Sequence, residues 1–240
     1  NGINVQAGIL TAKNIIDASD AQRNTRVGTN AGNSFDGTTA NRNTLIGYDA
    51  GTAITGADDN TFVGYRAGDA VTTGQENTFV GRDCGGSTNT GRSNVAIGYE
   101  TFVTNTTGSY NTALGYEALR ANTTANDNTA VGRASLRVNT TGDKNTSVGS
   151  YSLDANTTGS HNTGVGYESL GANTTGSYNT AVGRYAARSN TTGEDNAALG
   201  YNALDANTTG VKNTALGANA LDVNTTGDNN VAVGKHALGA

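Results

Sequence analysis

The chain repeats one short pattern of polar and apolar positions along most of its length. An Asn is followed by two residues, an aliphatic residue and Gly, and this motif occurs thirteen times in 240 residues. Successive motifs are seventeen residues apart, except that the first interval is nineteen. A strict period of this length predicts an all-β fold, a parallel β-solenoid or β-roll of about thirteen coils. The motifs begin at Asn24, Asn43, Asn60, Asn77, Asn94, Asn111, Asn128, Asn145, Asn162, Asn179, Asn196, Asn213 and Asn230.

Each motif has the alternation of a short strand. In the repeat that begins at Asn111, Thr112 and Leu114 face one side and Ala113 faces the other, because successive strand residues point to opposite faces. The Leu114 position is aliphatic in every copy, and we interpret it as the inside of the coil. Its members are Val27, Ile46, Val63, Val80, Ile97, Leu114, Val131, Val148, Val165, Val182, Leu199, Leu216 and Val233.

A second apolar position follows five residues later, at Leu119 in the same repeat. We expect a second extended segment here, facing the first across a narrow core. Early copies have Gly at this position, so the first coils are expected to be thinner or turned differently. The series runs Gly32, Gly51, Gly68, Gly85, Phe102, Leu119, Leu136, Leu153, Leu170, Ala187, Leu204, Leu221 and Leu238.

Two series of glycines predict corners with positive φ. One follows the aliphatic residue, as at Gly115, and the other precedes the next motif, as at Gly108. Ala125 interrupts the second series, so we expect local strain or a rearranged turn there. The Asn that opens each motif also suits a corner, and stacked Asn side chains are expected to hydrogen-bond along the solenoid.

The face opposite the aliphatic position carries small residues in most coils. We interpret it as an oligomer interface, because small residues permit close approach of another chain. A small-residue face turned to solvent is the alternative. The series runs Arg26, Leu45, Phe62, Phe79, Ala96, Ala113, Ala130, Ser147, Gly164, Ala181, Ala198, Ala215 and Ala232.

Two copies of the motif, 94–98 (Asn-Val-Ala-Ile-Gly) and 230–234 (Asn-Val-Ala-Val-Gly), resemble the repeat of YadA-like heads of trimeric autotransporter adhesins. The resemblance implies a left-handed parallel β-roll and a homotrimer. Our repeat is longer than the adhesin-head coil, because an Asn-Thr-Thr-Gly connection adds residues. Residues 2–12 resemble segments that precede such repeats in tail-fibre proteins of marine bacteriophages.

Composition narrows the function. Hydrophobic residues make up 35% of the chain, and Trp, Met and Pro are absent, which excludes a conventional globular core. The net charge is −5 without a basic run, so we expect no nucleic-acid partner. No apolar stretch is long enough to span a membrane, so we expect no membrane insertion. The single cysteine, Cys84, is interpreted as a small packing residue.

We divide the chain into an N-terminal extended lead-in segment, 1–23, and a β-solenoid repeat domain, 24–240. The absence of an initiator Met leads us to expect a piece of a longer parent. His161 and His236 fall at different positions of the repeat, and both are expected to face solvent. No motif assigns a catalytic, cofactor-binding or metal-binding residue, so we expect a chain that is not an enzyme and needs no cofactor.

Three surface features remain open. The residue pairs before each motif, such as 58–59 and 194–195, vary and are expected to be exposed turn tips, either unconstrained or in contact with a receptor. Six tyrosines after the corner Gly form a broken aromatic ladder that either supports the stack or binds a glycan. Eight Asn-Thr-Thr segments are formal glycosylation acceptors, better explained as a repeated turn. The tyrosines are Tyr48, Tyr65, Tyr99, Tyr116, Tyr167 and Tyr201, and the eight segments begin at Asn105, Asn122, Asn139, Asn156, Asn173, Asn190, Asn207 and Asn224.

The leading functional hypothesis is a structural fibre or shaft with an adhesive, receptor-binding role, from a phage tail fibre or a cell-surface adhesin, and therefore extracellular. Its partners would be copies of itself, and a cell-surface receptor or glycan. One alternative is an ice-binding solenoid, in which Asn and the second Thr of each Asn-Thr-Thr form two parallel ranks. Another is a subunit of a self-assembling extracellular filament.

Overall fold

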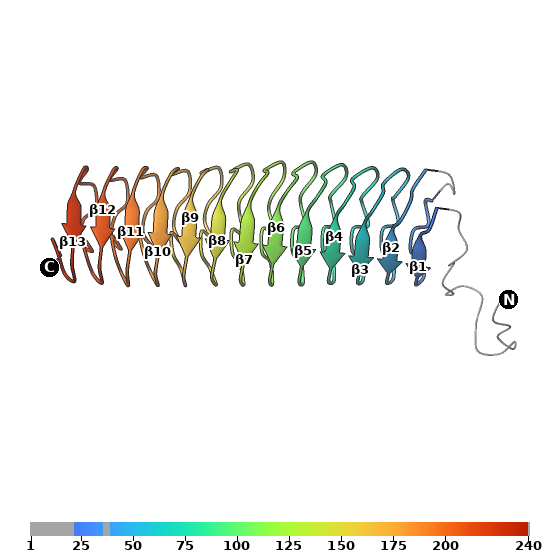
Figure 1. The fold of residues 1–240 in the computed structure, drawn as a ribbon, viewed down its shortest axis with the longest axis horizontal. Coiled ribbons are helices and arrows are strands. Elements are labelled where there is room, and N and C mark those ends of the chain that lie inside the picture. Colours follow the sequence, from blue (N-terminus) through green and yellow to red (C-terminus); the bar gives the residue numbers. More distant parts are fainter. Residues whose placement is uncertain (1–21, 36–38, 240) are drawn as a thin grey trace, which may run out of the picture.

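The structure, a computed structural model, describes residues 22–35 and 39–239. It is a β-solenoid in which thirteen three-residue strands form one parallel sheet in sequence order, with no helix among the described residues (Figure 1). The expected lead-in at 1–23 and the segment at 2–12 lie almost entirely outside the described residues. The strands are β1 (Thr25–Val27), β2 (Thr44–Ile46), β3 (Thr61–Val63), β4 (Thr78–Val80), β5 (Val95–Ile97), β6 (Thr112–Leu114), β7 (Thr129–Val131), β8 (Thr146–Val148), β9 (Thr163–Val165), β10 (Thr180–Val182), β11 (Ala197–Leu199), β12 (Thr214–Leu216) and β13 (Val231–Val233).

Every strand pairs with the next in a register that shifts by one repeat. Thr112 lies beside Thr129, and Ala113 beside Ala130, and the nineteen-residue first interval keeps the same register between β1 and β2. Because equivalent residues stack on one another, every position of the repeat becomes a continuous rank along the solenoid. The predicted parallel solenoid with a seventeen-residue repeat is therefore confirmed.

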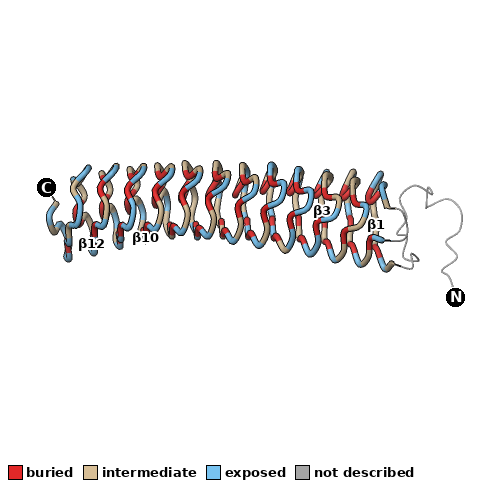
Figure 2. The backbone as a smooth tube through the Cα atoms, turned by 90° about the horizontal axis from the view of Figure 1, so that it is seen from above, coloured by how far each residue is buried: buried red, intermediate tan, exposed pale blue. Residues whose placement is uncertain are grey.

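The prediction of which strand face lies inside was wrong. Ala113 is 0% exposed, whereas Leu114 is 44% exposed. Figure 2 shows that buried and exposed residues occur together in coil after coil. The small-residue series is thus the core side of the sheet, and the aliphatic series faces outward. An oligomer interface at the Ala113 position is excluded, because that face is filled by the chain's own core.

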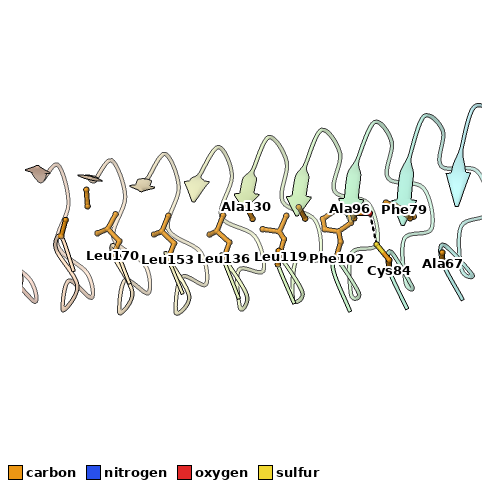
Figure 3. Packing of buried hydrophobic residues seen from close by; sticks show 14 of the residues in the cluster. Ala67, Phe79, Cys84, Ala96, Phe102, Leu119, Ala130, Leu136, Leu153 and Leu170 are labelled. Carbon is orange, nitrogen blue, oxygen red and sulfur yellow. Dashed lines mark hydrogen bonds between the residues drawn. The ribbon is translucent and has the colours of Figure 1, made fainter. Parts of the chain in front are cut away.

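The core is closed by the residues of the second apolar position, as expected. Leu119, Leu136, Leu153 and Leu170 are fully buried and project toward the strands that carry the alanines (Figure 3). A leucine fills most of the space across the coil, so the strand residue opposite it is small: Ala, Ser or Gly. Burial of each leucine contributes about 1.5–3 kcal/mol, and the stack is stabilised by many such increments.

In the early coils the large core residue is on the strand and the small one is in the turn, the reverse of most later coils. Phe62 and Phe79 are fully buried on the strand, and Gly68 and Gly85 stand where later coils have leucine. A Cβ atom at Gly85 would lie 2.3 Å from the ring Cδ2 of Phe79, so the aromatic ring occupies that space. The prediction of thinner first coils was therefore wrong, because the bulky strand residues compensate for the glycines. Phe62 and Phe79 stack with ring centroids 5.0 Å apart.

The second apolar segment is a turn rather than a strand. Leu119 has a φ of +52°, and Glu117 and Asp127 of the same coil have φ values of +54° and +58°. Left-handed residues other than Gly are uncommon, and here they recur in rank after rank because the tight coil must reverse direction within a few residues. The expectation of two facing extended segments per coil was wrong on this point.

The two glycine series have different roles. Gly115 and its equivalents have φ values from +118° to +143°, which confirms the predicted corner. Gly108 has no positive φ, but a Cβ atom there would lie 2.4 Å from the carbonyl oxygen of Ala125 in the next coil, so close approach requires glycine. Ala125 itself accepts hydrogen bonds from Asn111 and Asn122 at 2.9 and 3.1 Å, as its glycine counterparts do, so the turn is not rearranged.

Two ladders of buried asparagines line the coil beside the apolar core. In the first, the Oδ1 atom of Asn111 accepts the backbone N–H of Asn128 at 3.0 Å, and Asn128 Nδ2 donates to the carbonyl of Gly142 at 2.9 Å. In the second, Asn122 Nδ2 donates to Asn105 Oδ1 at 2.9 Å. The predicted hydrogen bonding between stacked asparagines is confirmed, and it satisfies backbone groups that a three-residue strand leaves unpaired.

Candidate binding surfaces

The outward side of the sheet is a regular surface that runs from β1 to β13. We call it the strand face; it consists of the first and third residues of the thirteen strands. The first residue is Thr in ten of the thirteen strands, and the third is aliphatic in all of them. Exposed fractions of the aliphatic side chains include 38% for Ile46, 50% for Leu199 and 65% for Val233. The result is a flat face with one rank of mainly Thr beside one rank of Val, Ile and Leu.

An apolar rank of this length is unusual on the surface of a soluble monomer, because such proteins rarely expose large contiguous apolar patches. The neighbouring threonines are partly exposed, and those at 112, 146, 180 and 214 are the more exposed ones. β-Branched side chains on a pleated sheet are also rigid, so covering them costs little conformational entropy. The strand face therefore has the composition and shape of a docking surface.

A rank of aromatic and cationic residues borders the strand face at the corner after each strand. Tyr48 stacks on Tyr65 and Tyr99 stacks on Tyr116, each with ring centroids 5.5 Å apart. Arg82 lies between the two pairs, with its guanidinium 5.8 Å from the Tyr65 ring and 5.4 Å from the Tyr99 ring. The predicted broken ladder is thus present, and cation–π contacts bridge part of the break.

Ion pairs connect neighbouring coils on the same side. Arg137 Nε lies 2.9 Å from Asp154 Oδ1, and Arg188 Nε lies 3.0 Å from Asp205 Oδ1. Burial raises the pKa of both aspartates, and the paired arginines counteract that effect. Half-exposed pairs of this kind add about 0–1 kcal/mol each, so they align the coils more than they stabilise them.

The turn tips are exposed at their second residue. Asp59 and Asp195 are exposed, and Asp59 receives two hydrogen bonds from the guanidinium of Arg42, at 2.6 and 2.8 Å. That hydrogen-bonded contact lowers the pKa of Asp59. Asp58 is half-buried and accepts the backbone N–H of Asn41 at 2.7 Å, so the tips are tied into the ladder rather than free.

The asparagines of seven of the eight Asn-Thr-Thr segments are buried, and the last, Asn224, is half-buried. Asn105 and Asn122 are 0% exposed, and their Nδ2 atoms donate hydrogen bonds within the turn. This confirms the repeated turn as the reason for the motif. It also excludes the two ranks first considered for ice binding, because the Asn rank is inside the coil.

The remaining candidate residues do not gather into a reactive site. His161 and His236 are both exposed, as predicted, and His161 stacks on Tyr178 with centroids 5.0 Å apart. Cys84 is fully buried, its thiol donates to the carbonyl of Ala96 at 3.1 Å, and burial raises its pKa to about 12 (Figure 3). Its interpretation as a packing residue is confirmed.

Residues 22–35 and 39–239 contain no cluster of three or more His, Cys, Asp or Glu side chains that could hold a metal ion. They also contain no helix of the length and apolarity needed to cross a bilayer.

Comparison with protein families, curated proteins and solved structures finds no match for this chain. The strand face, the tyrosine–arginine rank and the turn tips are therefore judged on their own chemistry. Sequence reasoning identified the second and third of these surfaces but assigned the strand face to the core. The signal that distinguishes the two faces was present in the chain, since every bulky residue at the Phe62 position is accompanied by Gly at the Gly68 position.

Proposed function

We propose that the chain is the shaft of an extracellular structural fibre that self-associates as a homotrimer through its strand face. The observation that carries the proposal is the unbroken outward rank of aliphatic side chains from β1 to β13. Association of three such faces around one axis would bury the rank along its whole length. The trimer itself follows from the resemblance to adhesin heads, and a phage tail fibre or a cell-surface adhesin is the setting that fits it.

Several properties support a passive shaft rather than an enzyme. The stack repeats the same ranks of buried Asn, Ala and Leu, and its polar surface groups pair mainly with their equivalents in adjacent coils. Catalysis requires a few groups in a unique arrangement, which a regular stack does not favour. Recognition of a receptor would then fall to the surfaces that vary from coil to coil.

The assembly is tested by charge substitution on the strand face. Val148→Glu, in the middle of the sheet, is expected to dissociate the trimer, because a carboxylate in an apolar interface is poorly solvated and unpaired. Lys144→Glu, at the exposed turn tip of the same coil, is the matched control and should leave the trimer intact. Sedimentation velocity with both variants decides the matter, and an identical mass for all three proteins would reject the strand face as the interface.

A second candidate function, ice binding, is favoured by one observation. The threonines of the strand face form a straight rank beside the aliphatic one, on a flat parallel sheet, with the regular spacing of about 4.8 Å between strands. A monomeric chain that produces thermal hysteresis, and loses it on Thr146→Glu, would support this function. A trimer that covers the same face would exclude it.

A further inference from the structure

A hollow lies between the turns that follow β8, β9 and β10. Figure 1 shows these three strands as neighbours in the sheet. Its volume is about 630 Å³, and it is lined by Tyr151, Asp154, Tyr167, Glu168, Gly171 and Arg188 among others. These residues come from three successive coils. The hollow is therefore a local departure from the repeat, and its lining is a unique combination of side chains in a chain built from repeated ones.

The hollow exists because Gly171 lacks a side chain. The equivalent residues in nearby coils are Arg137, Asp154, Arg188 and Asp205, which pair in twos across adjacent coils. No side chain at position 171 continues the rank between Asp154 and Arg188. Gly171 has no positive φ, and an added Cβ atom would lie 3.3 Å from the carbonyl oxygen of Glu168, so the backbone does not demand glycine here.

A second glycine in the same rank provides an internal comparison. Gly86 opens a smaller hollow of about 250 Å³, lined by charged residues such as Arg66, Asp83 and Glu100 and by no aromatic ring. Loss of a side chain from the rank is therefore sufficient to open a space. It is not sufficient to give that space an aromatic wall.

The aromatic wall combines Tyr167, a member of the recurrent tyrosine rank, with Tyr151, which stands at a position that several other coils fill with Glu. Tyr151 has a φ of +58° and stands where Glu100, Glu117 and Glu168 stand in their coils. Tyr167 packs edge-on against Tyr151, with centroids 6.2 Å apart and rings at 85°. Tyr167 is 40% exposed, so part of its ring faces the hollow and solvent rather than the core.

The polar groups of the hollow retain free hydrogen-bonding capacity. Arg188 uses its Nε and Nη2 groups on Asp205, which leaves other guanidinium N–H donors for a ligand. The two oxygens of Asp154 accept from Arg137 at 2.9 and 3.3 Å, and the carboxylates of Asp154 and Glu168 each keep further lone pairs for a ligand. Two carboxylates and one guanidinium line the hollow, so its net charge is negative and disfavours an anionic ligand.

Aromatic faces next to acidic acceptors and a guanidinium donor match the surface of a neutral sugar, which has an apolar face of C–H groups and a rim of hydroxyls. We propose that this hollow binds a neutral hexopyranose residue of a cell-surface glycan. The inference rests on the proposed adhesive function and deepens it by naming the ligand class and the site. In a trimer the site would occur three times, and avidity would strengthen weak single contacts.

The test uses the 240-residue chain and two kinds of probe. Neutral oligosaccharides of glucose, galactose, mannose or N-acetylglucosamine form one set, and sialylated oligosaccharides form the other. We expect saturable binding to at least one neutral member, measured by saturation-transfer NMR, and weaker binding to the sialylated set. Absence of saturable binding to every neutral member, or preference for the sialylated set, would overturn the inference.

Variants then locate the site. Gly171→Arg fills the hollow with a side chain common in this rank and is expected to weaken binding at least tenfold. Gly86→Arg makes the same change in the other hollow and should bind as the parent does. Tyr151→Glu restores the acidic residue of that position and is a second test if Gly171→Arg fails to fold, as judged by circular dichroism. Unchanged binding by both Gly171→Arg and Tyr151→Glu would place any sugar elsewhere.

The outcome separates this inference from the proposed assembly. If the chain is a trimer that binds no neutral sugar, the glycan site is rejected and the proposed shaft stands. If it is a monomer that binds a neutral sugar at Gly171, the trimer is rejected and the glycan site stands.

Discussion

Gly68 lies against the ring of Phe62, and a Cβ atom at Gly68 would come within 2.5 Å of the ring Cε2 atom. In later coils the same two positions hold Ala and Leu, as in the pair Ala113 and Leu119. The coil thus has one core volume that either side can fill. This relationship explains why the large residue is on the strand in the first four coils and in the turn from Phe102 to Leu170.

The pair Phe62 and Gly68 should be replaceable by Ala and Leu together, whereas either substitution alone should destabilise the coil. Phe62→Ala alone is expected to cost about 3–5 kcal/mol through the cavity it leaves, and Gly68→Leu alone to destabilise by overpacking. The double variant recreates the later coils, so its cost should be smaller than the sum of the two by about 2 kcal/mol or more. Chemical denaturation of the four proteins measures the coupling.

The control for this double-mutant comparison combines Phe62→Ala with Gly171→Leu, which changes a glycine six coils away. These two costs should add, because distant sites without shared partners are independent. Strict additivity for the Phe62 and Gly68 pair as well would contradict the shared core volume.

The first asparagine ladder should be essential for stability. Asn128→Ala removes the acceptor of the Asn145 backbone N–H and the donor to the Gly142 carbonyl, both at 2.9 Å. Each buried group left unpaired costs about 1–3 kcal/mol, so we expect a loss of about 2–4 kcal/mol in thermal or chemical unfolding. Glu194→Ser together with Asp195→Ser, at an exposed tip, should change stability by no more than about 0.5 kcal/mol per site. Equal effects at the two places would show that the ladder is dispensable.

The Ala113 rank should respond to charge as a core does. Ala181 is 0% exposed on the strand, so Ala181→Glu is expected to unfold at least the surrounding coils rather than to dissociate an oligomer. Circular dichroism and sedimentation of the same sample distinguish the two outcomes. A folded monomer from Ala181→Glu would restore the Ala113 rank as an interface.

Cys84 should be inert while the chain is folded. Burial raises its pKa to about 12, so the reactive thiolate is almost absent at pH 8, and the thiol is shielded by its coil. Labelling with a thiol reagent should therefore follow unfolding. The raised pKa also means that this residue's contribution to stability is present below the unfolded value near 9 and is lost as the pH rises toward 12. Fast labelling of the folded chain at pH 8 would contradict this burial.

The seventeen-residue period was enough to predict the solenoid and the parallel order of its strands, because identical units stack in register. The Asn that opens each motif also predicted the first asparagine ladder, whereas the ladder of the Asn-Thr-Thr segments was not foreseen. It was not enough to assign the two strand faces. In a globular strand the larger apolar residue is usually inside, but in this coil Leu119 closes the core from the turn, and Ala113 is all that fits opposite. Leu114 is therefore on the outside, where it is 44% exposed.

The candidate sites were predictable to different degrees. The tyrosine rank and the turn tips follow from single positions of the repeat and were found. The hollow at Gly171 depends on one missing side chain among residues from three coils, so its parts are far apart in the sequence and only the stacking of Tyr151, Tyr167 and Arg188 brings them together.

The mass of the wild-type chain in solution tests the central claim most directly, because the claim is that the chain self-associates as a trimer through its apolar strand face. Sedimentation equilibrium should give about 73 kDa, three times the chain mass of 24.2 kDa, over a wide range of concentrations. A stable, folded 24.2 kDa monomer at the same concentrations would contradict it.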